Sequence, residues 1–206
     1  MKNIVFLLCA LSLMSCRKTE KYYDPYGRLT SSMEMKNGKP DGVSLFYFND
    51  GINVYQETHY KNGKLNGYTT RWYYLSGKES EEYYVDDKLD GVRMGWYKNG
   101  RPSLEEYYSN GVLNGSSKEW FNNGQIKKET YYNNGIPTKE WHYYDNFGFE
   151  LGYANFDDNG NGAKITISPD NTMKYSLYDS GTQYFDTLLV YSEQIYQQYK
   201  QKIASR

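Results

Sequence analysis

The chain has 206 residues, of which 18% are aromatic, and its formal net charge at pH 7 is −1. Such a chain lacks the strong positive field that holds nucleic acid, so we expect no nucleic-acid partner. Both cysteines, Cys9 and Cys16, lie at the N-terminus, so the remainder of the chain has no disulfide, no thiolate metal site and no cysteine nucleophile.

The N-terminus has the features of a lipoprotein signal peptide over residues 1–15. Lys2 supplies a basic start, and residues 4–11 are apolar but too few to span a bilayer. The segment closes with the motif Leu-Met-Ser-Cys, which ends at Cys16 and resembles the bacterial lipobox. An ordinary signal peptide with a chance cysteine is the alternative interpretation.

This resemblance implies that Cys16 becomes the first residue of the mature chain and is the lipidation site, with residues 16–21 as a short tether. Several acyl chains anchor a protein durably, because each buried CH₂ contributes about 0.8 kcal/mol. An aspartate at the position after the lipidated cysteine would resemble an inner-membrane retention signal, but Arg17 occupies this position and Lys18 follows it. We therefore expect a lipid-anchored protein of the cell envelope, in the outer membrane, and leave open whether it faces the periplasm or the exterior.

A repeat of 24 residues dominates the next region, which we place at residues 22–160. Three sets of residues share this spacing: Tyr60, Tyr84, Tyr108 and Tyr132; Trp72, Trp96, Trp120 and Tyr144; and Glu57, Glu81, Glu105 and Glu129. A fixed period of this length indicates stacked supersecondary units, each of which buries apolar surface only against its neighbours.

Asn-Gly and Asp-Gly dipeptides divide each repeat into two short segments, as at Asn62-Gly63, Asn110-Gly111 and Asn134-Gly135. Both residues of such a pair tolerate the positive φ that primed hairpin turns require. The predicted fold class is therefore an all-β repeat: an elongated antiparallel sheet of about 24-residue β-hairpin repeats. Five repeats would supply ten strands.

The repeat is similar to that of the MORN-repeat variant family, whose unit is approximately Tyr-x-x-Gly-x-x-x-Gly-x-x-x-x-Trp-Tyr-x-x-Gly. One unit matches at Tyr108, Gly111, Gly115, Trp120, Phe121 and Gly124. Asp87 and Lys139 replace expected glycines, and one extra residue lies between Trp72 and Gly77. The resemblance implies an elongated sheet used for protein association or membrane attachment. Some members are antitoxins of toxin pairs, a role that suits a lipid-anchored protein poorly.

Period-2 alternation gives both faces of the predicted sheet an aromatic residue and a glutamate, so neither face is a pure core. The glutamates of the 24-residue spacing would form an acidic row on one face. We expect basic residues that follow the turns, Lys78 and Arg101, to pair with this row. A cation-binding or catalytic row is the alternative.

Residues 161–206 break the period and predict a C-terminal hairpin followed by a capping helix. Residues 163–167 and 173–177 alternate apolar and polar residues on either side of a turn. Apolar residues then recur at steps of three or four: Leu188, Tyr191, Ile195, Tyr199 and Ile203. We predict one amphipathic helix from Asp186, its N-cap, to Ile203, which covers the hairpin and closes the open end of the sheet.

Residues that could carry chemistry are few. Asp157 and the Asn-x-Asn-Gly that ends at Gly162 match the opening of a calcium loop, but Ser168 stands where a bidentate glutamate is required. This favours a plain Asn-Gly turn. His59 and His142 lie in different repeats without metal-ligand spacing or a nucleophile motif. We therefore expect no metal, no cofactor and no enzymatic activity.

The sequence favours an envelope protein, anchored by lipid, whose aromatic sheet serves as a protein–protein interaction or scaffold module. Glycan or cell-wall binding through aromatic stacking is the alternative, and a hydrolase acting through the glutamate row is weaker because no two carboxylates are tuned differently. Most rings are expected to hold the sheet together. The candidate binding residues are Trp72, Trp96, Trp120, Tyr144, Tyr84 and Tyr108.

Overall fold

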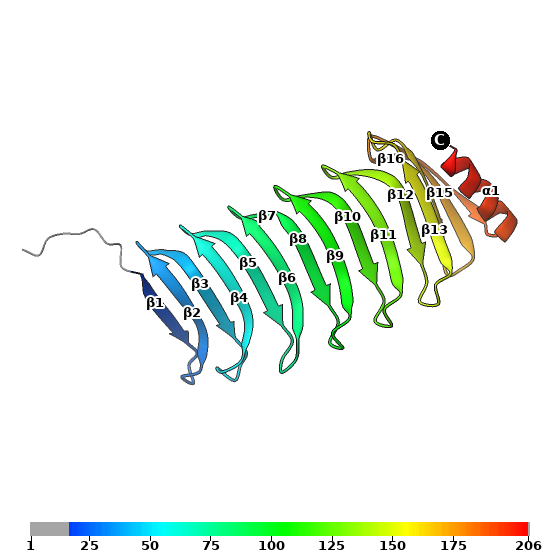
Figure 1. The fold of residues 1–206 in the computed structure, drawn as a ribbon. Helices are drawn as coiled ribbons and strands as arrows, with labels where there is room; N and C mark the ends of the chain where they lie inside the picture. The colour runs from blue at the N-terminus through cyan, green and yellow to red at the C-terminus, as the bar shows by residue number, and fades with distance from the viewer. Residues whose placement is uncertain (1–16, 206) are drawn as a thin grey trace, which may run out of the picture.

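The structure is a computed structural model that describes residues 17–205 as one elongated layer (Figure 1). Its elements are β1 (Lys18–Tyr23), β2 (Leu29–Lys36), β3 (Lys39–Tyr47), β4 (Val54–Lys61), β5 (Lys64–Trp72), β6 (Lys78–Val85), β7 (Lys88–Leu89), β8 (Gly91–Trp96), β9 (Pro102–Ser109), β10 (Val112–Trp120), β11 (Ile126–Asn133), β12 (Ile136–Tyr144), β13 (Glu150–Phe156), β14 (Gly162–Ile167), β15 (Thr172–Asp179), β16 (Thr182–Val190) and α1 (Glu193–Ala204). The strands form one 16-stranded sheet in chain order, with β7 paired only to β6. Neighbouring strands are antiparallel, which confirms the predicted all-β hairpin repeat with one C-terminal helix. In the described part of the chain, no helix is both long and apolar enough to cross a membrane.

One series of hairpin turns joins each repeat to the preceding one. Asn62 and Gly63 both have positive φ, as the dipeptide predicts, and the N–H of Gly63 donates to the carbonyl of Pro40 at 2.7 Å. Asp87, which replaces a glycine, keeps a φ of 70°. Its carboxylate accepts the N–H of Leu65 at 2.7 Å, so this departure from the repeat pattern adds a bond between repeats.

The opposite series of turns is tied together by side chains. The Tyr73 hydroxyl donates to the carbonyl of Trp96 at 2.8 Å, and the Tyr97 hydroxyl donates to the carbonyl of Trp120 at 2.6 Å. Asn99 donates to the side chain of Asn122 at 2.6 Å in the same direction. The tyrosines that follow Trp72 and Trp96 therefore have a structural role in stacking the repeats.

At the N-terminus, the sheet begins earlier than the sequence predicted. β1 begins at Lys18, inside the segment expected to be a tether, because it pairs along β2 from Lys18 opposite Met35. The carboxylate of Asp24 accepts backbone N–H bonds in the first turn just as Asp145 does in a later one, so the partial unit before the array belongs to the sheet. Cys16 and the predicted signal peptide lie outside the described residues.

At the C-terminus, the predicted hairpin is β14 and β15, but a further strand, β16, takes the start of the segment predicted as helix, up to Val190, and α1 takes the rest from Glu193. Asp186 lies within β16 and forms an ion pair with Lys174 at 2.6 Å, so it is not an N-cap. The helix begins at Glu193, and the hydroxyl of Ser192 accepts the N–H of Ile195. The alternation of Leu188 and Val190 with their neighbours, next to β15, outweighed the helical spacing.

Helix α1 packs on one face of the sheet and not across its open edge (Figure 1). Tyr196 and Ile203, seven residues apart, are buried against Ile165 and Met173 of β14 and β15. The helix therefore covers the predicted hairpin as a cap, as expected, while the strand β16 forms the C-terminal edge of the sheet. The reason is that the apolar residues of this helix match the apolar face of β13–β15, where each buried side chain contributes about 2 kcal/mol.

Candidate functional site

The six candidate binding residues lie on two opposite faces of the sheet. Tyr84 and Tyr108 each lie two residues after Glu82 and Glu106 and point the same way as these glutamates, and we call this side the tyrosine face. The other four share the opposite side, the tryptophan face: Trp72, Trp96, Trp120 and Tyr144. No single surface can therefore use all six residues.

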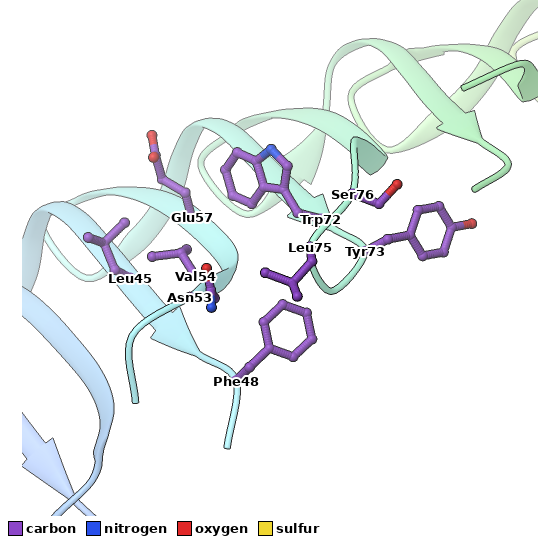
Figure 2. Close-up of a pocket in the computed structure, with 9 residues that line it drawn as sticks. All are labelled: Leu45, Phe48, Asn53, Val54, Glu57, Trp72, Tyr73, Leu75 and Ser76. Carbon is purple, nitrogen blue, oxygen red and sulfur yellow. The ribbon is translucent and has the colours of Figure 1, made fainter. Parts of the chain in front are cut away.

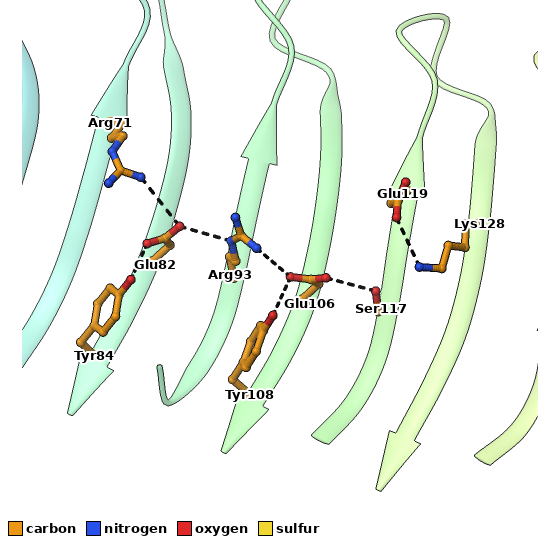
Figure 3. Close-up of polar contacts among 9 residues, drawn as sticks. All are labelled: Arg71, Glu82, Tyr84, Arg93, Glu106, Tyr108, Ser117, Glu119 and Lys128. Atoms are coloured by element: carbon orange, nitrogen blue, oxygen red, sulfur yellow. Dashed lines mark hydrogen bonds and ion pairs between the residues drawn. The ribbon is translucent and has the colours of Figure 1, made fainter. Parts of the chain in front are cut away.

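The tyrosine face carries a row of alternating charges that crosses the strands (Figure 3). Arg93 lies between two carboxylates, 3.2 Å from Glu82 and 3.1 Å from Glu106. The hydroxyls of Tyr84 and Tyr108 donate to the same two carboxylates at 2.7 Å and 3.0 Å. Each glutamate therefore has both an ionic and a hydrogen-bonding partner.

Burial strengthens this charge row. Glu82 is 6% exposed, and Arg71 adds a second, longer contact at 4.0 Å. Burial and the bond to Glu82 raise the pKa of Tyr84 to about 12, so its phenol stays a donor at neutral pH. Burial lowers the pKa of Arg93, but attraction by Glu82 and Glu106 outweighs it and raises the pKa overall. The hydroxyls of Tyr84 and Tyr108 thus stabilise the sheet through bonds to its own glutamates.

On the tryptophan face, the glutamate row is paired more locally than expected. Glu81 contacts Lys78, as predicted, and Glu129 contacts Lys118 at 3.0 Å. The predicted role of Arg101 is wrong: its guanidinium donates to the carbonyl of Asn122 at 3.2 Å, across to the next turn. Glu57 contacts His59 at 3.6 Å and no lysine among the described ion pairs. Glu57 and Glu105 therefore lack the lysine partner that Glu81 and Glu129 have among the described ion pairs.

Beside Glu57, the tryptophan face opens into a groove of about 530 Å³ between two successive turns (Figure 2). Its lining comes from β3 to β5 and the turns that join them to their neighbours: Leu45, Phe48, Asn53, Val54, Glu57, Trp72, Tyr73, Leu75 and Ser76. We call this site the aromatic groove. Its size and its mixture of apolar walls with a few polar groups are those of a ligand-binding site.

Leu75, which lines the aromatic groove, has an unusual backbone conformation. It has a φ of 50°, a conformation that costs an L-residue with a Cβ about 1–2 kcal/mol, and it is 74% exposed. Nearby, Phe48 makes edge-on contacts with Tyr74 and Tyr55 at 5.0 Å and 5.5 Å between ring centroids. Strained, exposed apolar residues are concentrated at functional sites, so Leu75 marks the groove as a candidate site.

Among the six candidates, only Trp72 lines the aromatic groove. Trp96 lies under the ammonium of Lys78, 5.9 Å from the ring centroid, and Tyr144 stacks on His142 at 6.1 Å. Sequence reasoning missed Phe48 and Leu75, although Phe48 lies 24 residues before Trp72 and the repeat spacing could have revealed it. The signal that could have revealed Leu75 was the extra residue between Trp72 and Gly77.

We predict that Leu75→Asn stabilises the protein. Asparagine tolerates positive φ, so relief of strain should raise the free energy of unfolding by about 1 kcal/mol, as measured by urea denaturation. The matched control is Ile52→Asn, because Ile52 is equally exposed, at 78%, and its φ is not positive. An equal response of both variants would show that loss of surface apolarity, and not strain, is responsible.

The segment that resembles the opening of a calcium loop forms a turn. One carboxylate oxygen of Asp157 accepts the N–H groups of Asn159 and Asn161, both at 2.9 Å, and the other accepts the amide of Asn161 at 3.0 Å. These bonds lower the pKa of Asp157 against the opposing effect of burial. Residues 17–205 hold no cluster of three or more His, Cys, Asp and Glu side chains that could bind a metal ion.

No protein-family model and no curated protein matches the chain. Among solved structures, a chain of "Crystal Structure of TcdB2-TccC3-TEV" is similar at 15% sequence identity and a TM-score of 0.25. The match covers 84% of this chain but 12% of that one. Because the TM-score is so low, this similarity carries no argument about function.

Proposed function

We propose that this protein is a non-enzymatic binding module of the cell envelope that recognises a protein partner through the aromatic groove. The observation that carries the proposal is the position of Leu75, strained and exposed, between Phe48 and Trp72. Such a wall is suited to an apolar side chain inserted by a partner, since a few buried anchors supply most of the energy of protein association.

Charge supports a partner segment that carries a lysine or arginine next to its apolar anchor. Glu57 lies at the groove with only His59 beside it, whereas Glu81 and Glu129 each have a lysine. A basic residue of the partner would give Glu57 the neutralising contact that Lys78 and Lys118 give to Glu81 and Glu129.

The remaining parts of the proposal rest on the sequence. The lipobox-like close at Cys16 supports a lipid anchor in the outer membrane, and the 24-residue pattern supports membership of the MORN-repeat variant family. The first strand of the sheet begins at Lys18, so a lipid on Cys16 would hold the repeats close to the membrane surface. The aromatic groove, between β3 and β6, would lie in the half of the sheet nearer to the anchor.

Glycan binding is the second candidate, because Trp72 lies with Asn53 and Glu57 in one groove. A flat ring together with an amide and a carboxylate can stack on a sugar and accept its hydroxyl bonds. The aliphatic walls formed by Leu45, Val54 and Leu75 offer no such bonds, which is why a protein side chain is favoured.

A photo-crosslinking amino acid at Ser76, on the groove rim, tests the proposal in cells of the native host. We expect a discrete protein adduct that disappears when Trp72→Ala or Glu57→Gln is added. The same crosslinker at Lys98, in the corresponding turn of the next repeat, is the control and should give no such adduct. Equal adducts at both positions, or an adduct insensitive to both substitutions, would overturn the assignment.

Tryptophan fluorescence of residues 17–206, titrated with peptidoglycan fragments, separates the glycan alternative. A saturable change that Trp72→Ala abolishes, in a variant with an unchanged circular dichroism spectrum, would replace the protein partner by a glycan. We expect no saturable change.

A further inference from the structure

The C-terminal edge of the sheet presents free backbone hydrogen-bonding groups. β16 is the last strand in the sheet order, and Tyr191, just after it, donates its N–H to Asn171 on the β15 side at 3.0 Å. Antiparallel alternation then directs the N–H and C=O groups of Asp186, Leu188 and Val190 outward. These groups have no strand beside them in the described part of the chain.

The side chains along this edge are apolar and exposed. Tyr184, Leu188 and Val190 are 64%, 69% and 81% exposed, and Phe185 is also exposed. The single charge, Asp186, is already paired with Lys174 at 2.6 Å. An edge with this composition is one that readily adds another strand.

The opposite edge of the same sheet is different. β1 has six residues, of which three are charged: Lys18, Glu20 and Lys21. Natural sheets protect their edges with charged residues, especially lysine, and with proline, neither of which is present in β16. The register irregularity of β16 lies before Phe185, so residues 185–190 are regular and available for pairing. The two ends of the array therefore differ in their capacity to add a strand.

We propose that β16 pairs antiparallel with β16 of a second copy of this chain, about a two-fold axis at Thr187. In this register Thr187 faces its own copy, Phe185 faces Leu189, and Tyr184 lies beside Val190. Such Thr–Thr and aromatic–β-branched pairs stabilise antiparallel sheets. Asp186 faces Leu188 of the second copy, so the two Asp186 carboxylates do not oppose each other.

The backbone and the helix both permit this arrangement. Asp186 of one copy lies opposite Leu188 of the second copy. Both residues direct their N–H and C=O groups toward the other copy, so they form a hydrogen-bonded pair. Helix α1 lies over the face of β13–β15, where Tyr199 packs on Tyr175 at 4.8 Å between ring centroids, and not beyond the outer edge of β16, so the two helices do not obstruct the pairing. The contact is self-complementary and closed, which gives a dimer with one continuous sheet and not a filament.

Sedimentation velocity of residues 17–206, which contain every described strand and the helix, tests the proposal over a wide concentration range. We expect a monomer–dimer equilibrium that ends at the dimer. Leu188→Pro removes an outward N–H but no bond to β15, so it should raise the dimer dissociation constant at least about tenfold, with an unchanged circular dichroism spectrum.

Opposite charges at the same position test the register. Leu188→Asp places two carboxylates face to face with Asp186 of the second copy and should weaken the dimer, whereas Leu188→Lys should form ion pairs and tighten it. A monomer at every concentration, an open-ended series of oligomers, or equal effects of Asp and Lys would each overturn the proposed pairing.

Discussion

Arg93→Met should lower the free energy of unfolding by about 3 kcal/mol. Arg93 bridges Glu82 and Glu106 on the tyrosine face, and the side chains of these two glutamates are only 8% and 14% exposed. Methionine preserves much of the side-chain length but leaves two poorly solvated carboxylates without their shared guanidinium. Urea denaturation followed by circular dichroism measures the loss.

Lys98→Met is the matched control, since Lys98 is exposed and lies in the turn after β8. It should change stability by less than about 0.5 kcal/mol. Glu82→Gln added to Arg93→Met should recover part of the loss, because removal of both partners leaves fewer uncompensated charges than removal of one. A loss in Arg93→Met no larger than the control's would show that solvent already compensates these carboxylates.

The charge row also shows what the sequence could not reveal. The 24-residue period predicts the strands, their order and the positions of Tyr84 and Tyr108, because hairpin turns and alternation are local properties. Glu82 recurs in the next repeat as Glu106, but Arg93 occupies a place held by Thr69 and Ser117 in the neighbouring repeats. Their pairing depends on the register between strands, which the repeat spacing alone does not specify.

The aromatic groove was hidden for a related reason. Periodicity selects residues that recur, and Phe48 does fall 24 residues before Trp72, but Leu75 stands at the spacing of Asn99 and Asn123 and distinguishes its turn from theirs. Of the six predicted binding residues, Trp72 alone lies there. The extra residue before Gly77 was visible in the sequence, but its effect is a positive φ at Leu75, which backbone geometry reveals and residue type does not.

The C-terminal segment shows competition between two periodicities. Leu188 and Tyr191 fit a helical spacing with Ile195, yet β15 offers a full-length partner for the extended conformation. A strand on an existing sheet gains backbone bonds immediately, whereas a helix must first form an unfavourable nucleus. Ser192, an N-cap residue type, then starts the helix where strand pairing ends. The pairing of β16 with β15 therefore sets the boundary between the strand and the helix.

Ile203→Ala should detach the helix and unfold the C-terminal strands while the central repeats persist. Ile203 is fully buried with Ile165 and Met173, and truncation of such a side chain costs about 3 kcal/mol through lost burial and the cavity that remains. Repeats contact mainly their neighbours, so the loss should stay local. Hydrogen exchange should show reduced protection in β13–β16 and unchanged protection in β4–β10. Gln201→Ala, on the exposed side of α1, is the control and should leave both regions protected. Equal loss of protection along the whole sheet would contradict the prediction, because it would mean that the array and its C-terminal helix unfold as a single cooperative unit.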